Sequence, residues 1–564
     1  MSHFKPSNRY WAETHKVENL PSPLADYNAF KTDKALCDFT RQFSPSLDLA
    51  ELESFGALCG SASSIELGFE ANVYKPEFHT HDRFGHRVDE VRFHPSYHEL
   101  MRISMREGIH SSHWEGYGEG RHIKRAVKSY LMCQVEAGHG CPITMTSAAI
   151  PSLKNSPVLY GEWAPKILHR TYDPRNVPHT EKDSVTIGMA MTEKQGGSDV
   201  RSNTTYAHRL GDSNGSQLYE LVGHKYFVSA PMSDAFLVLA QTEPGVSCFL
   251  VPRWRPDGTK NPIQIQKLKN KMGNVSNASS ETELRGALGW RIGDEGKGVA
   301  TILEMVAMTR FDCMIGSSAG MRQAVAQATH HCASRKAFGN RLSKQPLMQN
   351  VLADLILESE ASIALSLRMA RALEQMEHSS QEAALMRIGT AVGKYWICKR
   401  TPGHAYEAME CIGGMGVMED TIMPRLFRES PVNAIWEGSG NVQCLDMLRA
   451  MQRTPESVEA LMAEIENARG FSTTFDNFAD KLVGTLCGLS EMNAEDIQFH
   501  SRSVIEQLAL SLQASTLIQF GDEVVADGFC SSRLDPSVSG LLYGSLPRGV
   551  DCNYLIDRAM PSNV

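Results

Sequence analysis

Hydrophobic residues follow two different spacings along this 564-residue chain, and the changes of spacing divide it into regions. Before residue 184, apolar residues recur every three or four positions in Leu47–Cys59 and Tyr97–Met105, which predicts amphipathic helices. From Ser184 the spacing becomes two, which predicts an antiparallel sheet or a small β-barrel. The predicted strands are Ser184–Met191, Tyr219–Val228, Ala235–Gln241 and Val246–Arg253.

Helical spacing returns at Gly296, in runs longer than most globular helices. Three runs, Gly298–Ser334, Gln345–Glu374 and Ser380–Arg400, and a fourth from Val442 predict a four-helix bundle. We therefore expect a mainly helical α+β protein. Its predicted parts are an N-terminal helical domain over 1–183, a middle β domain over 184–296, a bundle over 297–454 and an additional helical domain over 455–564. A doubly wound α/β fold is excluded because strands and helices do not alternate.

Composition narrows the class of protein further. The chain has 42% hydrophobic and 21% charged residues, a net charge of −9, and thirteen scattered cysteines without a CxxC pair. No apolar stretch approaches the ~20 residues that span a bilayer, and the N-terminus lacks the apolar core of a signal peptide. The histidines at 79, 81 and 86 lack further ligands at a familiar metal spacing. We expect a soluble cytoplasmic protein with reduced thiols, no metal and no membrane partner.

Ten consecutive residues leave an alternating strand and enter a Gly-Gly turn, and they form the first candidate binding segment. Such a loop offers backbone N–H groups and hydroxyls with little side-chain obstruction, which suits a flat ring or a diphosphate. A simple hairpin turn explains the same pattern, so both interpretations stay open. The residues are Met189, Ala190, Met191, Thr192, Glu193, Lys194, Gln195, Gly196, Gly197 and Ser198.

A carboxylate between an indole and a glycine-rich turn forms the candidate catalytic site. Glu437 lies there, and burial in an apolar site would raise its pKa and make it a usable proton acceptor. The alternative is that Glu437 or Asn441 only caps the helix that follows. The neighbouring candidates for cofactor contact are Ile435, Trp436, Gly438, Ser439, Gly440, Asn441, Val442 and Leu445.

Three further segments carry weaker signals. Phe227-Val228-Ser229 is a strand that ends in a hydroxyl, and by itself it indicates only a strand. Arg335 and Phe338 lie in a basic turn between two bundle helices, which either binds phosphate or is a solvated loop. The glycine cluster Cys411–Gly416 follows a helix, where glycine is common.

Together and in this order, the segments resemble the acyl-CoA dehydrogenase superfamily of flavoproteins. TEKQGGSDV, GHKYFVS, KAFGN, PVNAIWEGSGNVQCLD and the extra C-terminal region are similar to its AidB-type members. The resemblance implies FAD between the β domain and the bundle, bound by residues 189–198, by 227–229 and by the segment Ile435–Leu445. It also implies that Arg335 and Phe338 reach the cofactor of a neighbouring subunit, in a homo-oligomer that we expect to be a tetramer.

The resemblance assigns Glu437 as the base that removes the α-proton of a short or branched acyl-CoA, while the β-hydrogen leaves as hydride to flavin N5. The Glu437 backbone N–H would donate to the thioester oxygen. Some relatives carry the base in a Glu-Arg pair on a bundle helix, and here that pair is Thr309-Arg310, so Glu437 is the predicted base.

Two alternatives remain from the sequence. AidB-type members are linked to protection from DNA alkylation and to double-stranded DNA, so one alternative is a DNA-binding flavoprotein with little dehydrogenase activity. Residues 457–564 carry six Arg and Lys against fifteen Asp and Glu, a net charge of −9, which argues against phosphate binding. The other alternative is a protein that binds an acyl group or a lipid on this scaffold.

Overall fold

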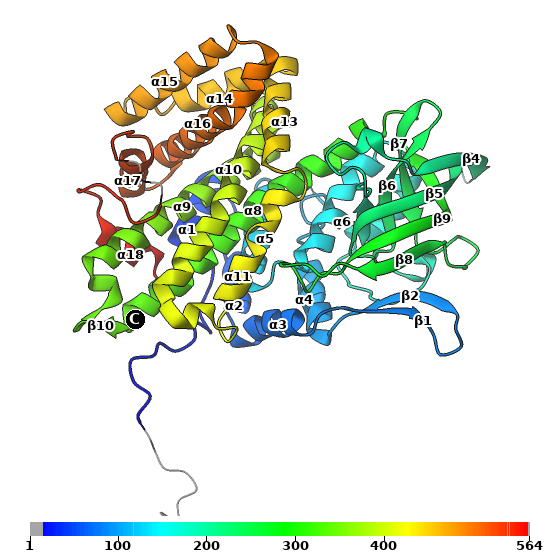
Figure 1. The fold of residues 1–564 in the computed structure, drawn as a ribbon, viewed down its shortest axis with the longest axis horizontal. Coiled ribbons are helices and arrows are strands. Elements are labelled where there is room, and N and C mark those ends of the chain that lie inside the picture. The colour runs from blue at the N-terminus through cyan, green and yellow to red at the C-terminus, as the bar shows by residue number, and fades with distance from the viewer. Residues whose placement is uncertain (1–14, 117, 214, 539, 541, 562–564) are drawn as a thin grey trace, which may run out of the picture.

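The computed structural model describes residues 15–116, 118–213, 215–538, 540 and 542–561. A β-barrel occupies one end of the long axis, the long helices fill the centre, and the C-terminal helices cover the other end (Figure 1). Residues 1–14, which we considered for a targeting signal, lie outside the described part. Among the described residues, no helix combines the length and the apolar character that a membrane span requires.

Seven helices form most of the N-terminal region. Asp33 caps the first of them by accepting the backbone N–H of Leu36, and Pro95 and Pro157 begin two others, where proline fits the first turn. The helices are α1 (Lys34–Phe43), α2 (Ala50–Cys59), α3 (Ala62–Val73), α4 (Pro95–Arg106), α5 (Arg121–Val135), α6 (Gly140–Leu153) and α7 (Pro157–Leu168).

A strand pair that the sequence did not predict lies between α3 and α4 of the mostly helical N-terminal region. An antiparallel hairpin lies there, formed by β1 (Glu77–His81) and β2 (Arg87–Arg92). Asp82 closes its turn by accepting the N–H groups of Phe84 and His86. The strands were missed because both are mostly half-buried, so polar residues occupy both faces and no clear alternation of hydrophobic residues marks them.

The middle region is a closed barrel rather than an open sheet. Strand pairing follows the order β3-β6-β4-β5-β9-β7, β6 also pairs with β7 to close the ring, and β8 pairs with β9. Most pairs are antiparallel, but β6 runs parallel to β3 and to β4. The strands are β3 (Ile187–Ala190), β4 (Tyr206–Ser213), β5 (Ser216–Ser229), β6 (Ala235–Thr242), β7 (Gly245–Pro252), β8 (Ile263–Leu268) and β9 (Ser279–Ile292).

Long helices follow the barrel. The three longest are α8 (Gly298–Ser334), α9 (Pro346–Gln375) and α10 (Ser380–Ile412), which pack against one another, and α13 (Gly440–Arg453) packs on α10. Helix α10 extends twelve residues beyond the predicted end at Arg400, because it continues through Pro402. Two short helices, α11 (Met423–Glu429) and α12 (Val432–Ile435), lie between α10 and α13.

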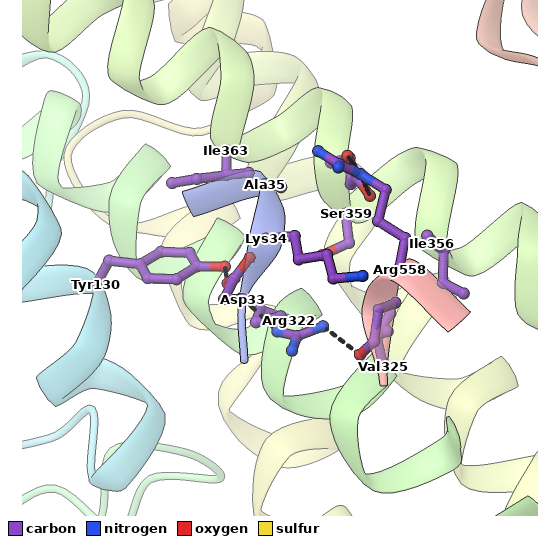
Figure 2. A pocket seen from close by; sticks show the side chains of 12 residues that line it. Asp33, Lys34, Ala35, Tyr130, Arg322, Val325, Ile356, Ser359, Ile363 and Arg558 are labelled. Atoms are coloured by element: carbon purple, nitrogen blue, oxygen red, sulfur yellow. Dashed lines mark hydrogen bonds and ion pairs between the residues drawn. The ribbon is translucent and has the colours of Figure 1, made fainter. Parts of the chain in front are cut away.

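The C-terminal region adds five helices: α14 (Glu456–Glu466), α15 (Thr473–Leu489), α16 (Ala494–Phe520), α17 (Glu523–Arg533) and α18 (Cys552–Ala559). Helix α18 docks through buried charges. Arg558 Nε donates to both carboxylate oxygens of Glu360 on α9 (3.0 and 3.1 Å), and Arg322 Nη1 donates to the carbonyl of Ala559 (2.9 Å). Asp33, Tyr130, Arg322 and Arg558 surround a cavity of about 10 Å³ here, room for about one water molecule (Figure 2).

Candidate active site

Glu437 lies on the turn between α12 and α13, where its side chain contacts α8. Its Oε2 accepts a hydrogen bond from the Thr309 hydroxyl at 2.9 Å. Burial raises the pKa of the Glu437 carboxyl, while the Thr309 hydrogen bond and the charges of Arg310 and Lys394 pull that pKa down. The net shift is upward, so the group is a stronger base than an ordinary glutamate.

The backbone of this turn is strained and is held by two cations. Glu437 has φ +58°, which a residue with a Cβ rarely adopts, and Gly438 follows with φ +101°. Arg310 Nε donates to the carbonyl of Glu437 at 2.8 Å, and Lys394 Nζ donates to the carbonyl of Gly438 at 2.6 Å. Both cations therefore bind the main chain of the turn, and the carboxylate itself contacts a hydroxyl.

The Thr309-Arg310 pair thus acts on Glu437 from one turn of α8. Sequence reasoning identified this pair only as the place where another base was missing. Its contacts with Glu437 span 128 and 127 residues of chain, so no local pattern could have revealed them.

The Met189–Ser198 segment contains a second glutamate, and this one is buried. Glu193 is 1% exposed, and its carboxylate accepts from Lys225 Nζ (2.7 Å), Thr204 N (2.7 Å) and Gln195 Nε2 (2.6 Å). Burial alone would raise the pKa of Glu193, but the Lys225 ammonium and these hydrogen bonds lower it to about 2. This side chain points into the protein and fixes the shape of the loop.

The loop lies beside the end of β5. The Tyr226 N–H donates to the carbonyl of Thr192 at 2.8 Å, and this bond brings the first and second predicted segments together. At the Gly-Gly turn, a Cβ on Gly196 would come within 2.5 Å of the Ser202 hydroxyl, so the loop requires glycine there. The Phe227 ring remains 45% exposed at the end of the strand.

The thiol of Cys141, at the start of α6, lies between the β5 end and the Glu437 turn. Burial raises the pKa of Cys141 to about 11, Lys271 lowers that pKa, Glu437 raises it, and the Ser229 hydroxyl is a hydrogen-bond partner. The buried Cys141 thiol therefore interacts with both Ser229 and Glu437. The structure brings together predicted residues from the barrel and from the helical region.

Comparisons with known proteins identify the family of this chain. Residues 19–174 match the adaptive response protein AidB N-terminal domain, residues 188–287 the acyl-CoA dehydrogenase middle domain, and residues 296–452 the acyl-CoA dehydrogenase C-terminal domain. The chain is 43% identical to AidB of Escherichia coli (strain K12) over 93% of its own length and 95% of that protein. The chain belongs to the AidB branch of the acyl-CoA dehydrogenase family.

Other relatives support the same family. The chain is 33% identical to acyl-CoA dehydrogenase family member 11 of Caenorhabditis elegans, over 95% of this chain and 85% of that protein. The crystal structure of C. elegans ACDH-11 in complex with C11-CoA covers 93% of this chain and 95% of its own, with a TM-score of 0.83 and 28% identity. The predicted acyl-CoA dehydrogenase fold is thereby confirmed.

Acyl-CoA dehydrogenases are FAD-dependent, and FAD is the cofactor of this chain. The predicted segments fit such a group in this structure. An exposed aromatic ring at Phe227, a turn without side chains at Gly196-Gly197 and the Ser229 hydroxyl offer an apolar surface and hydrogen-bond donors. The carboxylate of the loop, Glu193, is turned inward, so it does not oppose a diphosphate.

Some predicted cofactor residues lie elsewhere in this single chain. Arg335 caps the end of α8, and Phe338 lies in the β10–β11 hairpin (Lys336–Ala337 and Asn340–Arg341) that follows, at the opposite end of the helices from the barrel (Figure 1). Phe338 is 96% exposed. Asn441 accepts two hydrogen bonds from Arg502 of α16, at 2.9 and 2.7 Å. Cofactor contact by these residues stays a prediction.

Proposed function

We propose that this protein oxidises an acyl-CoA thioester to its α,β-unsaturated form, with Glu437 as the base. One observation carries the proposal. Within the described part of the chain, the Glu437 carboxylate accepts one hydrogen bond, from the Thr309 hydroxyl, while Arg310 and Lys394 bind the backbone around it. A half-buried carboxylate without a cationic hydrogen-bond partner is poised to take a proton.

The reaction follows from ordinary acid–base chemistry. The thioester carbonyl acidifies the α-proton, and the Glu437 carboxylate removes it. Electrons from the broken C–H bond form the double bond as the β-hydrogen departs. FAD, when bound, supplies the oxidant that takes up the β-hydrogen with its electron pair. Donation from the Glu437 N–H to the thioester oxygen would stabilise the enolate-like charge.

The proposal also covers the length of the acyl chain. We propose a short or branched acyl group, and C11-CoA, the ligand named for the ACDH-11 structure, belongs in the same test. We also propose a homotetramer, since Phe338 and Leu347, exposed by 96% and 86%, offer apolar side chains for contact with another subunit.

The charge distribution supports the dehydrogenase over the DNA-binding alternative. Four of the six cations in residues 457–564 are already engaged inside the chain. Arg469 pairs with Glu466, Arg533 with Asp354, and Arg558 with Glu360, while Arg502 donates to Asn441. Cations held in this way are poorly placed to neutralise phosphates.

The test is an absorbance spectrum of the purified protein followed by anaerobic titration with short, branched and C11 acyl-CoA. We expect flavin absorption that bleaches with at least one thioester. In Glu437→Gln, the bleaching rate should fall by a factor of about 10²–10⁴ while FAD stays bound. Bleaching at the wild-type rate in that variant would remove Glu437 from the role of base.

Two other results would identify the alternatives. Flavin absorption that no thioester bleaches, together with salt-dependent binding of duplex DNA, would replace the proposal by the DNA-binding one. A thioester that binds tightly without bleaching would indicate an acyl binder.

A further inference from the structure

Lys271 is a buried cation that the proposed mechanism does not use. It lies between β8 and β9, and its ammonium donates to the carbonyl of Asn277 at 2.7 Å and to the hydroxyl of Ser279 at 3.1 Å. Burial lowers the pKa of Lys271, and the charges of Glu136 and Glu429 offset part of that shift. In the described part of the chain, the direct hydrogen-bond partners of the ammonium are neutral oxygens.

Ser279 connects this cation to Ser229. The two serines face each other in the β5–β9 ladder, and their Oγ atoms are 3.1 Å apart. Side chains directly opposite in an antiparallel pair lie on the same face of the sheet. Val228 points the other way, into the barrel core, so Ser229 and Phe227 share the face toward the helical region.

The ammonium sets the direction of this chain of hydrogen bonds. A hydroxyl pair by itself allows either oxygen to donate. An ammonium has no acceptor, so Lys271 must donate to Ser279 Oγ, and this donation makes the Ser279 hydroxyl a stronger donor and a weaker acceptor toward Ser229 Oγ. In the favoured arrangement Ser229 accepts from Ser279, and its own hydrogen points away from Ser279.

We propose that Lys271 is a positioning residue for the flavin, acting through Ser279 to direct the Ser229 hydroxyl hydrogen at the cofactor. This inference rests on the placement of FAD against residues 227–229 in the proposed function. A donor aimed at the ring, backed by a buried positive charge, favours the electron-rich form of the ring. The relay should therefore make the bound FAD easier to reduce.

The experiment measures the midpoint potential and the visible spectrum of bound FAD, with saturating FAD and no thioester. Lys271→Met and Ser279→Ala should each shift the potential to more negative values and alter the flavin absorption bands. Their double variant should show no more than the larger single shift, because both changes break one chain. Lys271→Arg retains a donor and should restore part of the shift.

Lys267→Met is the matched control. Lys267 lies on the neighbouring strand, its side chain is 65% exposed, and it pairs with Glu281. This variant should keep the wild-type potential. Because Ser279→Ala removes one oxygen from a small residue, it keeps the test valid even where Lys271→Met fails to fold.

Three results would overturn the inference: a wild-type potential in both Lys271→Met and Ser279→Ala, single shifts that add fully in the double variant, and an equal shift in Lys267→Met. The proposed function fails differently. A wild-type protein that binds FAD but bleaches with no thioester overturns that function, while the potentials still decide the role of Lys271. A wild-type protein that takes up no FAD overturns both.

Discussion

Two glutamates, a buried one in the barrel loop and a half-buried one in the helical region, have opposite electrostatic surroundings. Glu193 accepts hydrogen bonds from a lysine ammonium, two backbone N–H groups and a side-chain amide, and its pKa falls to about 2. Glu437 accepts one hydrogen bond, from a hydroxyl, and burial raises its pKa. The donors around each carboxylate decide the direction in which its pKa shifts.

This difference explains why one glutamate has a structural role and the other suits the role of a base. A carboxylate saturated with donors is a poor base, because taking up a proton costs it an ion pair and several hydrogen bonds. Glu193 therefore maintains a loop. Glu437 has one donor to lose, and the cations near it are occupied by carbonyls, so protonation costs it little.

The largest expected effect comes from removing Glu193, the carboxylate with the most hydrogen-bond donors. Glu193→Ala should lower the free energy of unfolding by about 3–5 kcal/mol, because it leaves the Lys225 ammonium buried without its partner. Urea unfolding would measure the change. Asp212→Ala is the control, since it removes an exposed ion pair with Arg209 and should cost about 0–1 kcal/mol. Equal costs in the two variants would contradict the comparison.

A smaller effect sharpens the Glu437 side of the comparison. Thr309→Val removes the donor that stabilises the carboxylate, so the pKa of Glu437 should rise further. Protonated Glu437 cannot accept the α-proton, so the acidic limb of the bleaching rate should move to higher pH. Loss of a hydrogen bond to a charged group, about 1.5–3 kcal/mol, corresponds to roughly one to two pH units.

The pH profile of flavin bleaching would measure this shift. Thr309→Ser keeps the hydroxyl and should keep the wild-type profile. A Thr309→Val profile that does not move would show that Thr309 leaves the pKa of Glu437 unchanged, and one that moves to lower pH would show that Thr309 raises that pKa; either result contradicts the prediction.

The smallest predicted effect concerns the strained backbone. Arg310→Lys keeps the positive charge near Glu437. It loses the guanidinium group, which donates both to the Glu437 carbonyl and to the Asp446 carboxylate. We expect the bleaching rate to fall about tenfold, equivalent to about 1.4 kcal/mol, with the acidic limb unmoved. Rapid-mixing measurements across pH separate the two quantities. A limb that shifts without loss of maximal rate would indicate a purely electrostatic role for Arg310.

Much of the fold follows from short-range pattern. The predicted strand Ala235–Gln241 corresponds to β6 (Ala235–Thr242), and the predicted helix Gln345–Glu374 corresponds to α9 (Pro346–Gln375). Both were predictable because their buried residues form a clear pattern of hydrophobic residues in the sequence. The hairpin at 77–92 and the extension of α10 through Pro402 did not follow, since neighbours elsewhere in the chain stabilise backbone that local preference disfavours.

The site divides in the same way. Glu437 was recognisable as a candidate base because an isolated carboxylate beside a tryptophan and a glycine-rich turn is an unusual local pattern. Glu193 was recognisable only as part of a loop, and its partner Lys225, 32 residues away on β5, was not predicted.

By itself, the sequence determined the fold class, the family and the identity of the candidate base, because these depend on hydrophobic period and on local motifs. Only the tertiary structure decided how basic each glutamate is. A pKa depends on burial and on donors within a few ångströms, and those donors, Thr309 for Glu437 and Lys225 for Glu193, come from distant parts of the chain.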